Sequence, residues 1–216
     1  ARPDLLPPVA FLSTRVSKST EDDYRKLARV VRYLRGTRTK EMGCVLRPGG
    51  GLIEARTFVD VAFGVHADCK SQTGGAVVLG EAGAVDKGCE KQKIVTRSSA
   101  EAELVGVSDY ASHGFAMRNF LTCQGYRMGP VKIYQDNTSS IALIKRGRGT
   151  PGRARHVDIR YFWLKDKTDT GEAVIEHRSG VDMGIANVLT KPLQGEQFRK
   201  ERDELLNWPR AMGKRV

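Results

Sequence analysis

Several features are missing from this sequence of 216 residues, and each absence narrows the class of protein. No apolar run approaches the roughly 20 residues that a membrane-spanning helix needs, so no membrane partner is expected. No N-terminal segment has the charged, apolar and small-residue regions of a secretory signal. The chain begins at Ala1-Arg2-Pro3-Asp4 without an initiator methionine, which favours a fragment of something longer.

Closely spaced cysteines are also missing. The four cysteines stand singly, and none forms a CxxC pair. Structural zinc sites are usually built on such pairs, so a zinc site is not expected. Isolated cysteines of this kind are typical of reduced, mostly buried thiols in an intracellular protein.

Positive charge is present in clear excess. Lysine and arginine number 36 against 25 aspartates and glutamates, which gives a net charge of +11. Such an excess favours a polyanionic partner, with nucleic acid as the first candidate, although a basic surface kept for solubility is the alternative. With 40% hydrophobic residues, the chain is rich enough in apolar side chains for one domain and an appendage.

A helix is predicted ahead of a linker at Pro48-Gly49-Gly50-Gly51. Thr20 is its expected N-cap, acidic residues fill its first turn, and Gly36 is expected to end it after Arg35. Its apolar residues form one stripe, and much of the remaining surface is basic. That basic surface is suited to a phosphate backbone, but a merely solvated face is the more ordinary interpretation. The stripe consists of Leu27, Val30, Val31 and Leu34.

After the linker, strand and helix patterns alternate. A strand meander followed by strand–helix crossovers predicts one mixed sheet with helices on both faces. The strands are expected at 57–63, 74–79, 84–90, 131–135 and 172–177, and the helices at 98–124, 137–145, 156–166, 183–190 and 196–206.

Three carboxylates occupy unusual positions in this pattern. Asp60 lies inside an apolar strand, where an unpaired charge is costly unless it is exposed, paired or bound to a cation. Glu103 lies on the packed stripe of its helix, whereas Glu101 is expected to point toward solvent. Asp136 follows a short strand, where ligand sites often cluster, although an N-cap role is the alternative.

Convergence of these acids would give them a shared chemistry. Carboxylates that meet repel one another unless a cation neutralises them, and hard oxygen ligands select magnesium or manganese. A site with two such ions can carry out in-line displacement at a phosphate. A basic protein with such a cluster has what a nuclease needs.

Six short sequence motifs, taken together and in order, resemble the reverse transcriptase–RNase H region of copia-type retrotransposons. The resemblance runs from about Arg2 to about Leu206. The motifs are Arg29–Thr37 with Arg2-Pro3-Asp4 ahead of it, Lys70–Gly75, Lys91–Lys93 with Ser98–Leu104, Tyr134–Asn137, Arg155–Tyr161 and Leu189–Leu193.

This resemblance implies an organisation and an activity. Residues 1–50 would end the reverse transcriptase or its connection, 51–193 would form an RNase H-like five-stranded domain, and 194–216 would be a C-terminal helix and tail. The implied activity is two-metal hydrolysis of the RNA strand of RNA–DNA hybrids, with Mg²⁺ or Mn²⁺. The implied partners are the hybrid and the remainder of the polyprotein. The expected location is the cytoplasm, in a virus-like particle, with the nucleus as an alternative.

By motif, Asp60, Glu103 and Asp136 match the first three metal-binding acids of the family. The fourth normally stands in an Ala-Asp pair before the Leu-Thr-Lys-Pro phrase, but here the pair is Ala186-Asn187. Asn187 offers a carbonyl oxygen without charge, and Asp182 is too poorly spaced to replace it well. The alternative is therefore a remnant that folds and binds nucleic acid without cleaving. An integrase is a third hypothesis, but the order of the acids argues against it because integrases place their Glu last.

Further residues are expected around the site. His177 resembles a histidine that assists product release, and a surface histidine at a strand end is the equal alternative. A basic, glycine-rich loop is suited to sequence-independent contacts with phosphates, although disorder is its alternative. The expected nucleic-acid-binding residues are Arg146, Arg148, Arg153, Arg155 and Asn137.

Overall fold

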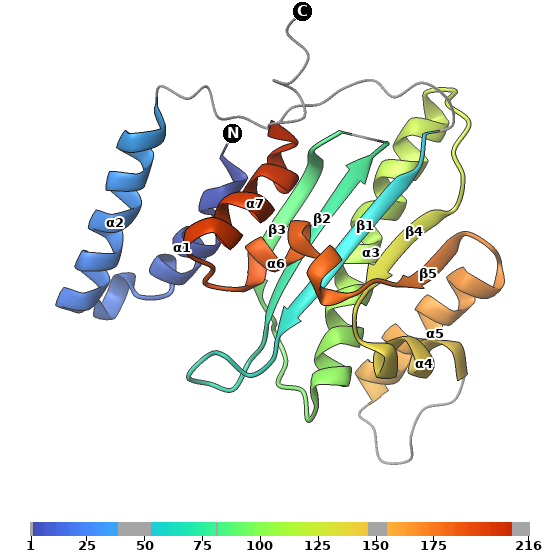
Figure 1. The fold of residues 1–216 in the computed structure, drawn as a ribbon. Helices are drawn as coiled ribbons and strands as arrows, with labels where there is room; N and C mark the ends of the chain where they lie inside the picture. Colours follow the sequence, from blue (N-terminus) through green and yellow to red (C-terminus); the bar gives the residue numbers. More distant parts are fainter. Residues whose placement is uncertain (1, 39–52, 81, 147–154, 209–216) are drawn as a thin grey trace, which may run out of the picture.

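The computed structural model describes residues 2–38, 53–80, 82–146 and 155–208 (Figure 1). The predicted linker at Pro48–Gly51 lies outside these residues. The α-helices are α1 (Leu6–Ser13), α2 (Glu21–Thr37), α3 (Ser99–Cys123), α4 (Thr138–Arg146), α5 (Arg155–Asp169), α6 (Gly184–Thr190) and α7 (Gly195–Leu206). The strands are β1 (Ala55–Ala62), β2 (Gln72–Leu79), β3 (Ala84–Lys91), β4 (Val131–Gln135) and β5 (Ala173–His177). Short 3-10 helices are η1 (Pro3–Leu5), η2 (Val16–Lys18) and η4 (Gly180–Asp182).

The strands form one five-stranded mixed sheet in the order β3-β2-β1-β4-β5. The meander β1-β2-β3 is antiparallel, whereas β4 and β5 join β1 in parallel pairings. Parallel neighbours need crossover connections, and α3 and the pair α4–α5 supply them. The predicted mixed sheet is therefore confirmed.

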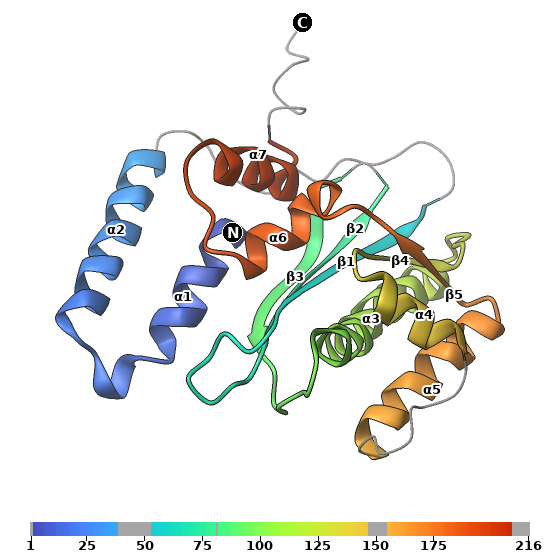
Figure 2. The same ribbon diagram turned by 60° about the horizontal axis from the view of Figure 1, so that its bottom comes forward.

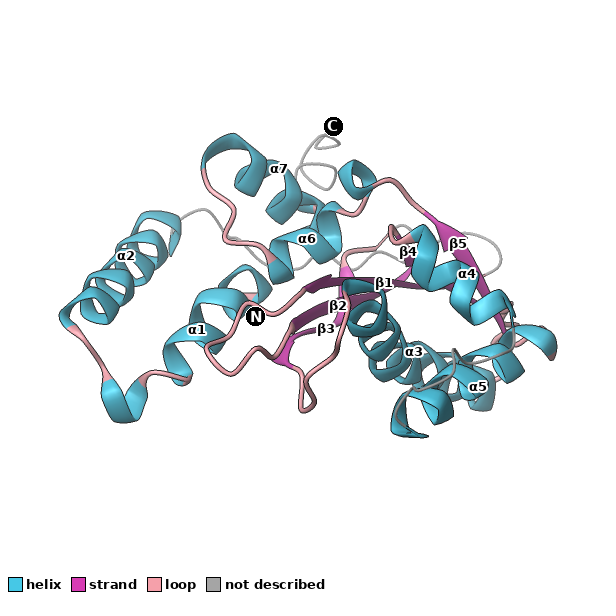
Figure 3. Ribbon diagram, turned by 90° about the horizontal axis from the view of Figure 1, so that it is seen from below, coloured by secondary structure: helices cyan, strands magenta, loops and turns pink. Residues whose placement is uncertain are grey.

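Helices cover both faces of the sheet, and each face has its own hydrophobic core. Figure 3 shows α3 and α5 on one side of the sheet and α6 and α7 on the other. The first core joins the sheet to α3, α4 and α5 through residues that include Val107, Ile144 and Leu164. The second joins it to α6 and α7 through Leu189 and Leu205.

The N-terminal segment packs onto the second core. Leu6 of α1 and Phe198 of α7 both border it, and Figure 2 shows α1 beside α6. A polar network ties α2 to these elements, because the Tyr33 hydroxyl donates to buried Asp4 at 2.6 Å and lies 3.4 Å from Arg202 Nη1. Arg2 also pairs with Asp4 at 2.7 Å. The predicted domain boundaries stay predictions, but residues on both sides of them share this core.

Most of α2 lies away from the sheet (Figure 1). Its predicted apolar stripe is largely uncovered, with Leu27 46% exposed, Val31 54% and Leu34 38%. Its basic residues are partly paired within the helix, as in the Arg25–Glu21 ion pair of 2.7 Å. The amphipathic pattern thus predicts the helix correctly, but it does not show that the apolar stripe is buried.

The predicted N-cap of α2, Thr20, is confirmed. Thr20 accepts a hydrogen bond from the Asp23 N–H, and the Asp23 carboxylate accepts one from the Thr20 N–H, which makes a capping box. Ser98 accepts from the Glu101 N–H at 3.2 Å at the start of α3.

Two details of these helices were predicted wrongly. Gly36 does not end α2, which continues to Thr37; the Thr37 hydroxyl bonds to the Tyr33 carbonyl at 2.8 Å and to Arg2. Glu101 does not point toward solvent. It is buried, and its carboxylate accepts from the Arg97 N–H at 3.0 Å as part of the helix start.

Gly74 of β2 sets how closely α6 approaches the sheet. A Cβ there would lie 2.6 Å from Thr190 Cγ2 and 2.9 Å from Leu189 Cβ, too close for any side chain. Gly74 is paired with Asp60 across the β1–β2 ladder. The missing side chain therefore lets the end of α6 reach the neighbourhood of Asp60.

We expect Gly74→Ala to lower the free energy of unfolding by about 1–3 kcal/mol, because the added methyl would overpack the contact with α6. Gly36→Ala is the matched control. A Cβ at Gly36 meets nothing within 4 Å, so it should raise the stability by about 0.5–1 kcal/mol through helix propensity. Urea unfolding followed by circular dichroism measures both. An unchanged midpoint for Gly74→Ala would contradict the close packing.

Candidate active site

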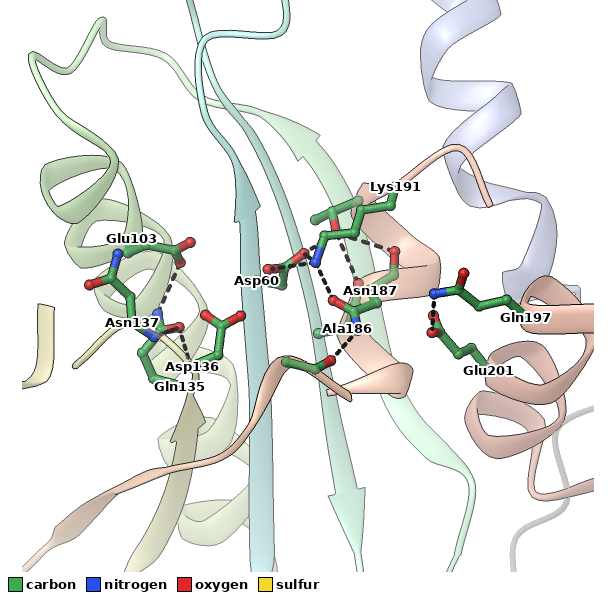
Figure 4. Close-up of polar contacts among 12 residues, drawn as sticks. Asp60, Glu103, Gln135, Asp136, Asn137, Ala186, Asn187, Lys191, Gln197 and Glu201 are labelled. Carbon is green, nitrogen blue, oxygen red and sulfur yellow. Dashed lines mark hydrogen bonds and ion pairs between the residues drawn. The ribbon is translucent and has the colours of Figure 1, made fainter. Parts of the chain in front are cut away.

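Three carboxylates meet at the centre of the sheet. Asp60 on β1, Glu103 on α3 and Asp136 after β4 each place an oxygen within 4.8 Å of the others. Asp60 and Glu103 are buried, with 3% and 6% of their surface exposed, and Asp136 is half-buried. Figure 4 shows the three side chains directed toward one region. The expected convergence of these acids is thus present, and their roles stay proposals.

The backbone pairing explains why the acids meet. β1 and β4 are parallel neighbours with Phe58 opposite Tyr134, so Asp60 and Asp136 each follow two residues later on the same edge. α3 lies close enough to bring Glu103 to them because Gly106 has no side chain. A Cβ on Gly106 would lie 2.5 Å from Val61 Cγ2.

Gln135 is a site residue that the sequence reasoning missed. It is fully buried, and its Nε2 donates to Glu103 Oε2 at 2.9 Å. Its Oε1 accepts from the backbone N–H groups of Asp136 and Asn137, at 2.7 and 3.3 Å. One amide therefore holds Glu103 and the Asp136 backbone in fixed relation. The signal was the same as for Asp60, a polar side chain within an apolar strand.

Two of the three acids have raised pKa values. Burial, and then the charge of Asp60, raise the pKa of Glu103 to about 8. Burial and Asp60 also raise the pKa of Asp136. A cluster of this kind needs protons or cations to stay compact.

Asn187 lies at the edge of this cluster, and both ends of its side-chain amide are already hydrogen-bonded. It is buried on α6, and its Nδ2 donates to the Gly180 carbonyl at 2.7 Å. Its Oδ1 accepts from Lys191 Nζ at 2.5 Å. The same ammonium lies 3.3 Å from Asp60 Oδ2, and the Thr190 hydroxyl donates to that oxygen as well.

Asn137 and His177 flank the acids. Asn137 Oδ1 accepts from the Ser140 N–H at 3.0 Å and so caps α4. The cap is therefore Asn137, not Asp136, which removes the alternative role considered for that acid. His177 is exposed at the end of β5, opposite Gln135, and its charge acts on Asp136.

Some of the remaining predicted residues are not part of this group of acids, and others lie outside the described residues. Arg146 is exposed at the end of α4, and Arg155 is the first residue of α5. Arg148 and Arg153 lie outside the described residues. Asp182 is exposed in η4, and it is not part of the group of converging acids found within the described ranges.

The donor set fits a hard divalent cation. Three carboxylates within 4.8 Å of one another present oxygen ligands, and magnesium and manganese prefer oxygen to nitrogen or sulfur. Burial first, and then the charge of Asp60, raise the pKa values of Glu103 and Asp136, and a bound cation would offset both effects. Asp60, Glu103 and Asp136 are thus the residues that would hold an ion.

A three-stranded meander continued by two parallel strands, with helices on both faces and acids at its centre, is the architecture of an RNase H-like domain. Among solved structures, RNase H1 from the archaeon Halobacterium salinarum is similar with a TM-score of 0.46 and 16% identity, covering 63% of this chain and 93% of that one. LC11-RNase H1, isolated from compost, has a TM-score of 0.48 and 11% identity, covering 63% and 91%.

The relatives found by sequence are retrovirus-related Pol polyproteins of copia-type transposons. Those from transposons RE2 and RE1 of Arabidopsis thaliana are each 31% identical to this chain over 202 residues, or 92% of it. The corresponding protein of transposon TNT 1-94 of Nicotiana tabacum is 25% identical over 197 residues. The chain spans only 13% of the length of the Arabidopsis relatives. No protein-family model matches it. The predicted relationship to copia-type retrotransposon polyproteins is confirmed.

In the part of the chain that the structure describes, no helix combines the length and the apolar character required to cross a membrane.

We expect the metal-free protein to lose stability as the pH rises from about 5 to about 8. Burial, and then the charge of Asp60, raise the pKa of Glu103 in the folded state from its ordinary value of 4.5 to about 8. Between these values the folded chain holds more protons than the unfolded chain, so the free energy of unfolding falls with rising pH. Thermal unfolding in a chelator would show a falling melting temperature.

Glu103→Gln should flatten this dependence, because it removes the titrating group and keeps a similar shape. Exposed Glu176 on β5 provides the matched control as Glu176→Gln. The difference between the two variants isolates Glu103. Equal pH slopes in both would show that Glu103 does not carry the raised pKa.

Proposed function

We propose that this domain hydrolyses the RNA strand of RNA–DNA hybrids in a metal-dependent reaction. The observation that carries the proposal is the meeting of Asp60, Glu103 and Asp136 within 4.8 Å, at the centre of an RNase H-like sheet. The relationship to Pol polyproteins supports a role in a retrotransposon. The net charge of +11 suits a nucleic-acid substrate.

Each residue of the site has a separate role in the proposed reaction. Asp60, Glu103 and Asp136 would hold the metal, and Gln135 bonds to the Glu103 carboxylate and to the Asp136 backbone. A bound divalent cation supplies a Lewis acid that lowers the pKa of water and neutralises charge on the phosphate. Water adds to phosphorus as the bond to the 3′ oxygen breaks, and that oxygen takes up a proton. The products are a 5′ phosphate and a 3′ hydroxyl.

We infer the substrate contacts from the kinds of residue around the acids. RNA would be distinguished from DNA through its 2′-hydroxyl and the shape of the hybrid groove. His177 stands exposed beside Asp136, where it would meet departing product. The basic residues from Arg146 to Arg155 would contact the phosphate backbone without regard to sequence.

A second candidate function has its own supporting observation. The position of the fourth acid is held by Asn187, whose carbonyl is already paired with Lys191 at 2.5 Å. A site that lacks this charge and has a lysine within it would bind metal less well than a four-acid site. The alternative is therefore a domain that binds hybrid without cutting it.

We expect cleavage of the RNA strand of a labelled hybrid in magnesium or manganese, with a loss of about 100-fold or more in Asp60→Asn, because that change removes a ligand charge. Asp169→Asn is the matched control. Asp169 is an exposed partner of Lys165 on α5, and surface pairs of this kind contribute little.

Asn187→Asp separates the two candidate functions. If the folded wild-type protein binds hybrid without cutting it and Asn187→Asp cuts, the domain is an impaired remnant. If neither cuts in either metal, the nuclease proposal is wrong. Circular dichroism establishes that each variant is folded.

A further inference from the structure

Lys191 places a positive charge beside Asp60, at the edge of the carboxylate cluster. Its ammonium lies 2.5 Å from Asn187 Oδ1, 3.3 Å from Asp60 Oδ2 and 3.5 Å from Asp60 Oδ1. Figure 4 shows it between these two side chains. The Asp60 side chain is only 4% exposed, so the contact is shielded from solvent on that side.

The backbone holds Lys191 in this position. α6 ends at Thr190, and the Lys191 N–H still bonds to the Asn187 carbonyl at 2.8 Å. Lys191 itself has φ −103° and ψ 141°, the extended conformation that a following proline favours, and Pro192 follows it. The close approach of α6 over Gly74 then brings the whole turn against β1 and β2.

Asn187 is oriented to receive the ammonium. Its Nδ2 donates to the Gly180 carbonyl at 2.7 Å, which leaves its Oδ1 facing Lys191. The charge also reaches the far side of the cluster, where Lys191 lowers the pKa of Asp136 against the effects of burial and of Asp60.

The charges then match a single divalent ion. Once a bound ion has displaced the proton from Glu103, three ionised carboxylates carry −3, and one ammonium adds +1, which leaves −2. With an aspartate at 187 the total would be −3, enough to attract a second ion. Asn187 and Lys191 together thus remove the charge that a second ion would balance.

We propose that Asn187, by removing the fourth negative charge, leaves the Lys191 ammonium as the second cation of the site, so that the site takes up one divalent ion on Asp60, Glu103 and Asp136. This inference rests on the proposed function and deepens it. It replaces the two-ion arrangement that the family resemblance implies with one ion and one lysine.

The test is the number of Mn²⁺ ions bound, measured by electron paramagnetic resonance of free Mn²⁺ and by calorimetry. We expect one ion for the wild-type chain and two for Asn187→Asp/Lys191→Met. Lys191→Met alone should bind its one ion roughly tenfold more tightly, because a like charge near the metal is gone. Lys191→Arg keeps the charge and should bind as the wild type does.

Lys165→Met is the matched control, since it removes one positive charge from α5 and leaves the cluster untouched. Its Mn²⁺ binding should equal that of the wild type. All variants are compared at equal ionic strength after circular dichroism shows that they are folded.

Two results would overturn the inference while leaving the nuclease proposal in place. One is a wild-type chain that binds two ions, and the other is unchanged Mn²⁺ affinity in Lys191→Met; in both cases Asp60→Asn would still weaken binding. A folded wild-type chain that binds no Mn²⁺ would instead overturn the proposed function and this inference with it.

Discussion

The close approach of two helices to opposite faces of the sheet is the constraint on which the rest of the structure depends. Gly106 lets α3 press against β1, and Gly74 lets α6 press against β2. Side chains at these positions would push the helices outward, and Glu103 and Lys191 would move away from Asp60. The carboxylate cluster thus depends on the absence of side chains at Gly74 and Gly106 as well as on the acids themselves.

The cluster works against the stability of the folded chain. Three acids are gathered where burial and mutual repulsion both favour protonation, and the pKa of Glu103 rises to about 8 as a result. Gln135 and Thr190 stabilise the arrangement through hydrogen bonds, and Lys191 contributes a charge. Hydrophobic packing on both faces of the sheet must supply the remaining stability. Strain of this type is expected at sites selected for chemistry.

Much of the fold follows from local patterns. The strand Val131–Gln135 was predicted with the bounds that the structure has, and α2 has the predicted N-cap, Thr20. Asp60 and Glu103 were identified because a charge in an apolar pattern is a local anomaly. Gln135 carried the same signal in a weaker form, since an uncharged amide at a strand end is less unusual.

What the sequence could not supply was long-range geometry. The role of Lys191 depends on a turn after α6 meeting β1, more than a hundred residues earlier in the chain. Glu101 could be assigned to solvent by helical period alone, because the period does not show that its carboxylate folds back onto the Arg97 N–H. The exposure of the α2 stripe likewise depends on which elements lie nearby, not on the helix itself.

The sharing of one core by α1 and α7 has a consequence for the order of folding. α1 lies at one end of the described chain and α7 at the other, yet Leu6 and Phe198 border the same cluster. Contacts between segments so distant in sequence form slowly, because a long loop must close first. During synthesis, the face of the sheet beneath α6 and α7 therefore stays open until Leu206, the last residue of α7, has left the ribosome, whereas the α3 face closes earlier.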